Sequence, residues 1–119
     1  LMFGAINGMT AEMMAVSEKV GVPPAKLFEI ITASQAGTVS NLFRELGSRV
    51  SEERYTDPTF TVSLLCKDVR LGVEMAEAAG APLMLGRTID FINKASCAQG
   101  YGDADSAVMW HCIRNFWKE

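Results

Sequence analysis

Lys67 is the residue of this sequence whose surroundings are most suited to binding a ligand. It interrupts an apolar stretch, with Leu65 and Leu71 near it, and the aromatic Phe60 precedes it by seven residues. A lysine at the edge of an apolar helix face can hold an anionic or polar ligand while its methylene stem lies on hydrophobic surface. Because most lysines are simply solvated, the residue types alone favour a solvated Lys67.

Three other candidate residues have simpler structural explanations. His111, the one histidine of the sequence, lies in an expected helix and is interpreted as a surface or hydrogen-bonded residue, in preference to a catalytic base. Asp103 and Asp105 follow a glycine turn and could ligate a cation, but two carboxylates without further oxygen ligands favour helix capping instead. The sequence therefore predicts no catalytic residue and no metal site within this chain.

The cysteines do not follow a metal-binding or disulfide pattern. Cys66, Cys97 and Cys112 are scattered without C-x-x-C spacing, which is typical of reduced intracellular thiols. The sequence also contains no G-x-G-x-x-G, P-loop, H-E-x-x-H or G-x-S-x-G motif.

Composition narrows the class of protein further. The 119 residues suit one domain, and the 49% hydrophobic content is rich enough that a partner is expected to cover part of the surface. The net charge of −3 without a basic run excludes a nucleic-acid binder. Charges interrupt the most apolar stretch, and no signal-peptide pattern is present, so we expect no membrane association and a cytoplasmic location.

Helical periodicity runs through nearly the whole sequence. Helices are expected over residues 1–20, 24–34, from 39 through at least 46, 61–79, 82–99 and in a last segment capped by Asp103 or Asp105. Residues 35–38 are expected to form a break, and 47–59 an irregular connection. No alternating strand pattern is present, which predicts an all-α multi-helix bundle spanning residues 1–119 as a single domain.

The first helix carries two stripes. The large apolar stripe contains Met2, Ile6, Met9, Met13 and Val16, and beside it lies the small-residue stripe of Gly4, Gly8, Ala11 and Ala15. Small residues spaced four apart let another helix approach closely, and such a contact could lie within the domain or between two subunits.

Four segments, in order along the chain, resemble the β-hydroxyacid dehydrogenase family, which includes 3-hydroxyisobutyrate dehydrogenase. Residues 60–76 resemble its segment F-x-x-x-L-x-x-K-D-[LV]-x-L-[AG], and residues 11–21 resemble its helix A-E-A-x-x-L-A-E-K-x-G. Residues 80–83 and 100–105 also resemble the family's pattern. The match is to the C-terminal domain, which implies the all-helical domain of 6-phosphogluconate dehydrogenase-like enzymes.

The resemblance implies a two-domain enzyme in which a separate Rossmann domain binds NAD or NADP. The helical domain then closes the cleft over a small hydroxyacid or semialdehyde and builds a homodimer or higher homo-oligomer. On this alignment the family's catalytic lysine lies just upstream of Leu1, so the chain is expected to be inactive alone. Lys67 matches a cofactor-binding lysine and Phe60 an aromatic position near it. Asp68 is expected to position the helix start or to pair with Lys67 or Arg70, and the role of Asp105 stays open.

Two alternatives remain at this stage. The glycine stripe and the apolar surplus equally suit a non-enzymatic helical dimerisation module that folds alone. Within the enzymes, an imine reductase relative would share the fold but use a different proton donor.

Overall fold

The computed structural model describes residues 1–34 and 39–116, and within these ranges it is all-helical. The elements are α1 (Met2–Lys19), α2 (Pro24–Ser34), α3 (Asn41–Glu52), α4 (Val62–Ala78), α5 (Leu85–Ala98), the short 3-10 helix η1 (Ser106–Val108) and α6 (Met109–Asn115). One isolated antiparallel bridge joins Thr61 and Asp105. The predicted all-α bundle is therefore confirmed; the expected break at 35–38 lies outside the described residues.

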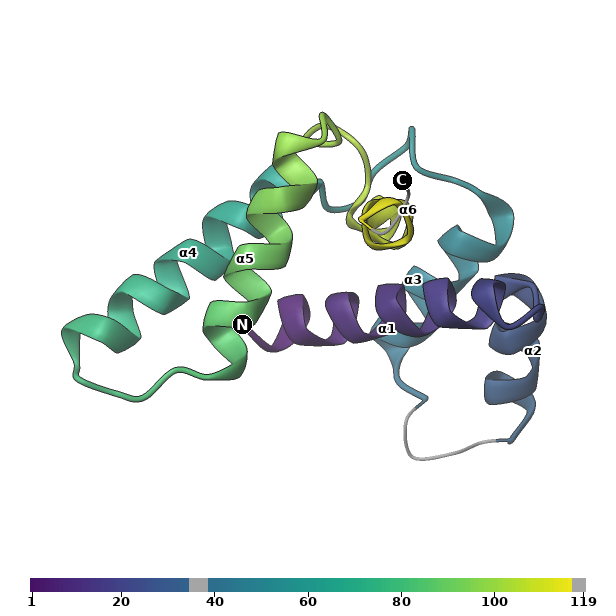
Figure 1. Ribbon diagram of the computed structural model, residues 1–119, viewed down its shortest axis with the longest axis horizontal. Helices are drawn as coiled ribbons and strands as arrows, with labels where there is room; N and C mark the ends of the chain where they lie inside the picture. Colours follow the sequence, from purple (N-terminus) through teal and green to yellow (C-terminus); the bar gives the residue numbers. More distant parts are fainter. Residues whose placement is uncertain (35–38, 117–119) are drawn as a thin grey trace.

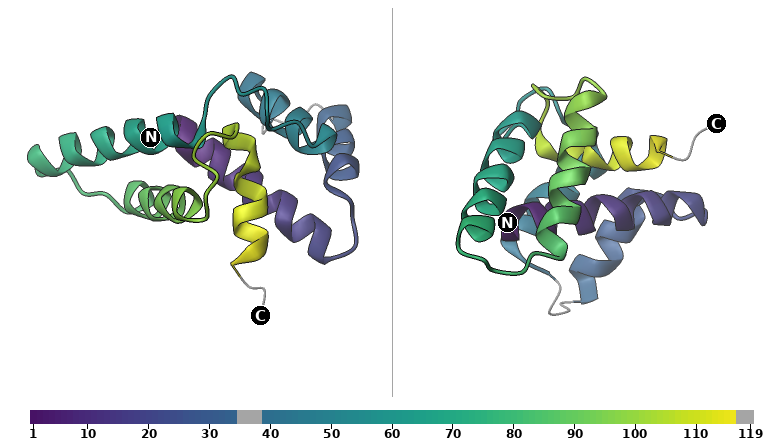
Figure 2. Two further views of the ribbon diagram at one scale, coloured as in Figure 1. Left: turned by 90° about the horizontal axis from the view of Figure 1, so that it is seen from above. Right: turned by 60° about the vertical axis from the view of Figure 1, so that its left-hand side comes forward.

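Helix α1 is the central element. It contacts α2 and α3 toward its C-terminal end and α5 toward its N-terminal end, while α6 packs across it (Figure 1). Helices α4 and α5 form an antiparallel hairpin that projects from the N-terminal end of α1, as both views in Figure 2 show. The core lies where these elements meet, and its most buried apolar side chains are Met14, Leu65, Val62, Val69, Met109 and Cys112.

The small-residue stripe of α1 is the face that packs inside the domain. A Cβ atom added at Gly4 would lie 2.8 Å from Ile89 Cγ2 and 2.9 Å from Val69 Cγ2, so α5 and α4 use the space that the missing side chain leaves. The predicted close approach is confirmed as a contact within the chain. Because its own helices cover this stripe, Gly4 and Gly8 do not offer a surface to a second copy.

Helix α3 is longer than the sequence predicts. Residues 47–52 continue the helix, whereas an irregular connection was expected there. Gly47 is helical because the ring of Phe28 occupies the place of its side chain: an added Cβ would lie 2.5 Å from Phe28 Cδ1. The helix then ends at Glu53, which adopts a left-handed conformation with φ of 52°.

Side-chain caps define the helix starts that bear on the site. Ser40 Oγ accepts a hydrogen bond from Phe43 N at the start of α3, and Thr61 Oγ1 accepts one from Leu64 N at the start of α4. Helix α5 begins at Leu85, three residues later than the expected start at Pro82. Among the described residues, no helix is long and apolar enough to cross a membrane.

Candidate functional site

The backbone before α4, which carries Phe60 toward Lys67, is fixed by the buried carboxylate of Asp105. Asp105 Oδ2 accepts hydrogen bonds from Thr59 N at 3.1 Å and Phe60 N at 3.5 Å, while Oδ1 accepts one from Ala107 N at 2.9 Å. Only 1% of Asp105 is exposed. The capping role predicted for Asp103 or Asp105 therefore belongs to Asp105, which caps η1 and also holds the approach to α4.

Backbone hydrogen bonds strengthen the same junction. Ser106 N donates to Phe60 O at 2.8 Å, and Val62 N donates to Ala104 O at 3.0 Å. Ser63 N donates to Gly102 O at 2.9 Å. These bonds satisfy two amides in the first turn of α4, which no helical carbonyl can reach. The loop of residues 100–106 thus holds the start of α4 in one register, and this register determines where Lys67 lies.

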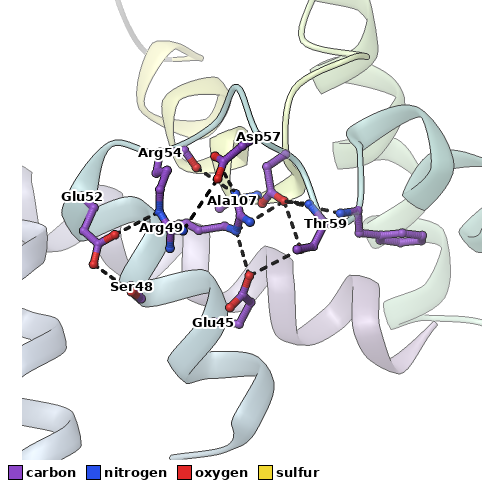
Figure 3. A network of polar contacts seen from close by, with 10 residues as sticks. Glu45, Ser48, Arg49, Glu52, Arg54, Asp57, Thr59 and Ala107 are labelled. Atoms are coloured by element: carbon purple, nitrogen blue, oxygen red, sulfur yellow. Dashed lines mark hydrogen bonds and ion pairs between the residues drawn. The ribbon is translucent and has the colours of Figure 1, made fainter.

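Arg49 supplies the counter-charge to Asp105. Its Nε atom lies 2.8 Å from Glu45 Oε1 and 3.6 Å from Asp105 Oδ2, and its Nη1 atom lies 3.3 Å from Asp57 Oδ1. Figure 3 shows the Arg49 side chain between Glu45 and the segment that carries Asp57 and Thr59. The hydrogen bond from Arg49 lowers the pKa of Glu45, so this carboxylate stays ionised beside the buried guanidinium.

Burial alone would lower the pKa of Arg49, but the hydrogen bond to Glu45 and the charges of Asp105 and Asp57 outweigh it and raise the pKa. The sequence pattern does not point to Arg49, since this residue falls in the segment 47–59 that was expected to be irregular. A continued helix would have placed it one turn from Glu45, which is the signal that could have found it.

Lys67 lies in the second turn of α4 on the outside of the domain. Its side chain is 53% exposed, and its Nζ atom lies 3.6 Å from Oδ1 of the equally exposed Asp68, which is the pairing expected for Asp68. Leu64 and Leu71, three residues before and four after it, are also exposed. The ammonium group therefore lies within an uncovered apolar stripe, where an anionic or polar ligand oxygen can reach it.

Phe60 lies apart from this stripe and packs toward the core. Its ring meets the ring of Phe3 edge to face, with 5.0 Å between centroids, and the residue is half-buried. Its contacts are with α1 and with residues 105–106, whereas Lys67 lies a turn and a half into α4. The structure thus holds the Phe60 backbone just before α4 through Asp105 and Ser106, and the Phe60 ring against Phe3.

His111 belongs to a separate cleft of about 700 Å³, which is also lined by Tyr101, Asp103 and Ala104 of the loop 100–106. Its ring lies tilted against the ring of Trp110, with 4.2 Å between centroids and 34° between planes, and meets the edge of Tyr55 at 5.5 Å. Trp110 Nε1 donates to Tyr55 Oη at 2.6 Å, and burial raises the pKa of that phenol. Within residues 1–34 and 39–116, no group of three or more His, Cys, Asp or Glu side chains could hold a metal ion.

The helical fold of this chain is similar to part of two solved dehydrogenase structures. The chain is similar to 3-hydroxyisobutyrate dehydrogenase from Salmonella typhimurium, with a TM-score of 0.85 and 26% identity over 92% of this chain. It is also similar to Mycobacterium tuberculosis 3-hydroxyisobutyrate dehydrogenase, solved with L-serine, with a TM-score of 0.73 and 25% identity over 92% of this chain. The match covers 38% and 39% of those two chains, so this chain spans well under half of either enzyme.

Sequence comparison points the same way. The chain is 26% identical over 104 residues to YfjR, an uncharacterized oxidoreductase of Bacillus subtilis (strain 168). These aligned residues make up 87% of this chain and 35% of YfjR. The family model described as "NAD-binding of NADP-dependent 3-hydroxyisobutyrate dehydrogenase" matches residues 1–113. Since that match covers nearly the whole chain, this protein belongs to the 3-hydroxyisobutyrate dehydrogenase family, and its all-helical fold matches the helical C-terminal domain of such enzymes.

Proposed function

We propose that this chain closes the active site and builds the oligomer of an NAD(P)-dependent β-hydroxyacid dehydrogenase, and that it has no activity by itself. In this proposal a Rossmann domain in another part of the full-length enzyme holds the nucleotide, and the general acid/base lysine also comes from outside these 119 residues. The observation that carries the proposal is the family match over residues 1–113 together with coverage of only 35–39% of the relatives.

Lys67 is the proposed contact to the cofactor, and its surroundings fit that role. Its ion pair with Asp68, a half-exposed neighbour on the same helix, is easily exchanged for a ligand oxygen. The exposed Leu64 and Leu71 beside it suit the apolar wall of a closed cleft. A bound nicotinamide nucleotide would supply the hydride chemistry, and Lys67 would hold and orient it by donating a hydrogen bond to one of its oxygens. Phe60 is the second residue that we propose to bind the cofactor; it lies just before α4, and its ring packs on Phe3.

The second part of the proposal is a homodimer or higher homo-oligomer. The large apolar stripe of α1 supports it, since Met2 is 80% exposed and Met9, Met13 and Val16 are exposed as well. Beside this stripe lies an apolar groove of about 320 Å³ between α1, α2 and α3. Monomeric proteins rarely leave such continuous apolar surface uncovered.

The test is a chimera in which these 119 residues replace the matching helical domain of the Salmonella typhimurium enzyme. We expect NAD(P)-dependent oxidation of 3-hydroxyisobutyrate by the chimera and none by the 119-residue chain alone. Lys67→Ala in the chimera should raise the KM for the cofactor about tenfold or more, with a smaller effect on kcat, because a charge-assisted hydrogen bond is lost.

The matched control is Lys94→Ala, a lysine on α5 that is also more than half exposed and pairs with Asp90. Equal KM values in the two variants would contradict the role of Lys67. A chimera that is folded and dimeric by circular dichroism and sedimentation, yet has no turnover, would contradict the enzymatic function and support the alternative, a non-enzymatic dimerisation module.

A further inference from the structure

Two cysteines that are 31 residues apart in the sequence meet between α4 and α5. Cys66 Sγ lies 2.9 Å from Cys97 Sγ, and Cys66 Sγ also lies 3.1 Å from the carbonyl oxygen of Asn93. Both thiols are free and both residues are half-buried, so solvent reaches the pair. The sequence shows no C-x-x-C spacing, and only the helical hairpin brings these residues together.

We propose that Cys66 and Cys97 form a modification site, a dithiol that closes to an intramolecular disulfide linking α4 to α5 when it meets a small-molecule disulfide of the glutathione class. A disulfide needs its sulfur atoms about 2.05 Å apart, so the pair has to approach by less than roughly 1 Å. The remaining cysteine, Cys112, is fully buried on α6 and takes no part in the reaction.

The exchange takes two steps, because the two thiols are in contact and only one of them can meet the small disulfide at a time. One thiolate of the pair attacks oxidised glutathione, forming a mixed disulfide and releasing one glutathione thiolate. The other cysteine of the pair then loses its proton, attacks the protein sulfur of the mixed disulfide and releases the second glutathione.

The exchange balances without any further reactant. Two protein S–H bonds and one glutathione S–S bond break, while one protein S–S bond and two glutathione S–H bonds form. The protein thiols lose two electrons and glutathione disulfide gains them. The second step is fast relative to a bimolecular attack because the two sulfur atoms are already in contact.

The bond would join the second turn of α4 to the last turn of α5. Cys66 directly precedes Lys67 in the sequence, and Cys97 lies one residue before the end of α5. A disulfide here would tie the hairpin at the end that the loop 100–106 already holds. Any effect on cofactor binding through Lys67 rests on the proposed function, whereas formation of the bond does not.

The experiment exposes the reduced 119-residue chain to glutathione buffers of increasing oxidised fraction and measures intact mass and disulfide-linked peptides. We expect a mass loss of about 2 Da, a peptide linking Cys66 to Cys97, and a rise in Tm on the order of 5–15 °C that a reductant reverses. Cys112→Ala should behave in the same way. Cys66→Ala should instead retain glutathione on Cys97, since nothing resolves the mixed disulfide.

Stable glutathione adducts on the wild-type chain without the linked peptide would overturn the proposal, as would disulfides formed only between chains. The wild-type mapping decides the question even where a cysteine variant fails to fold. Because the readout is mass and not turnover, failure of this proposal leaves the proposed function untouched. In the chimera, a disulfide that forms without changing the cofactor KM would separate the bond from the role of Lys67.

Discussion

Arg49 and Asp105 form an ion pair inside the domain, with 3.6 Å between Arg49 Nε and Asp105 Oδ2 and side-chain exposures of only 3% and 1%. Arg49 belongs to α3, whereas Asp105 caps η1 and accepts hydrogen bonds from the backbone before α4. The pair therefore connects the end of α3 to the start of the helix that carries Lys67. A buried charge is stable only when opposite charges and hydrogen bonds replace its lost hydration. For Arg49, the carboxylates of Glu45 and Asp57 provide this in addition to Asp105.

Replacing the Asp105 carboxylate should destabilise the domain. Asp105→Asn removes the charge opposite Arg49 and leaves fewer acceptors for the amides of Thr59 and Ala107. We expect the free energy of unfolding to fall by about 2–4 kcal/mol, measured by urea denaturation. Asp57→Asn is the control, because Asp57 is mostly exposed and should cost less than about 1 kcal/mol. Similar losses of unfolding free energy in the two variants would show that the buried Arg49–Asp105 pair contributes no more than the exposed Asp57 pair.

Substitution by alanine should destabilise the domain at Gly4 but not at Gly8, although both glycines lie on α1. Gly4→Ala gains about 1 kcal/mol of helix propensity but forces its Cβ against the stiff, β-branched Ile89 and Val69, so we expect a net loss of about 1–2 kcal/mol. Gly8→Ala meets only Ile89 Cδ1, the far end of a side chain, at 3.3 Å. It should be neutral or stabilising by up to about 1 kcal/mol. Thermal unfolding of both variants tests the contrast, and a loss at Gly8 as large as at Gly4 would contradict it.

Local sequence signals predict most of the fold but not the buried polar contacts. Helix periodicity, Gly21 and Gly80 as terminators and Thr61 at a helix start are all local features, and the structure confirms them. The continuation of α3 through Gly47 depends instead on Phe28, nineteen residues earlier, whose ring fills the space beside that glycine. Helix propensity counts Gly47 as unfavourable, and only tertiary packing reverses this.

In the candidate site, too, contacts between sequence neighbours could be predicted from the sequence, whereas contacts between distant segments could not. Of the three roles expected for Asp68, the structure shows the pairing with Lys67, which is a contact between neighbours in the sequence. By contrast, the contact of Cys66 with Cys97 and that of Phe60 with Phe3 need the relative placement of two helices or of a helix and a loop. The periodicity of one segment does not contain that information.

Native Cys66 should react slowly with alkylating agents at moderately alkaline pH. Its pKa is raised from 9.0 to about 12, so the folded state holds the thiol proton more tightly than the unfolded state does. The stability that this provides is fully present below pH 9 and is lost as pH rises toward 12. At pH 9 we expect iodoacetamide to modify Cys66 at least about tenfold more slowly in the native chain than in urea. Equal rates at pH 9 would contradict the raised pKa.

The exposed methionines of α1 should control the oligomeric state. If the large apolar stripe forms the subunit contact, Met9→Ser together with Met13→Ser removes apolar area from its middle, where both side chains border the groove between α1, α2 and α3. We expect sedimentation velocity to show a dimer for the unchanged chain and a shift of the dissociation constant by about tenfold or more toward monomer for the double variant. Met75→Ser is the matched control, since Met75 is 72% exposed but lies on α4, away from that groove. A dimer weakened by Met75→Ser and not by the double variant would move the interface to the α4–α5 hairpin, and the stripe of α1 would then be left for the Rossmann domain to cover.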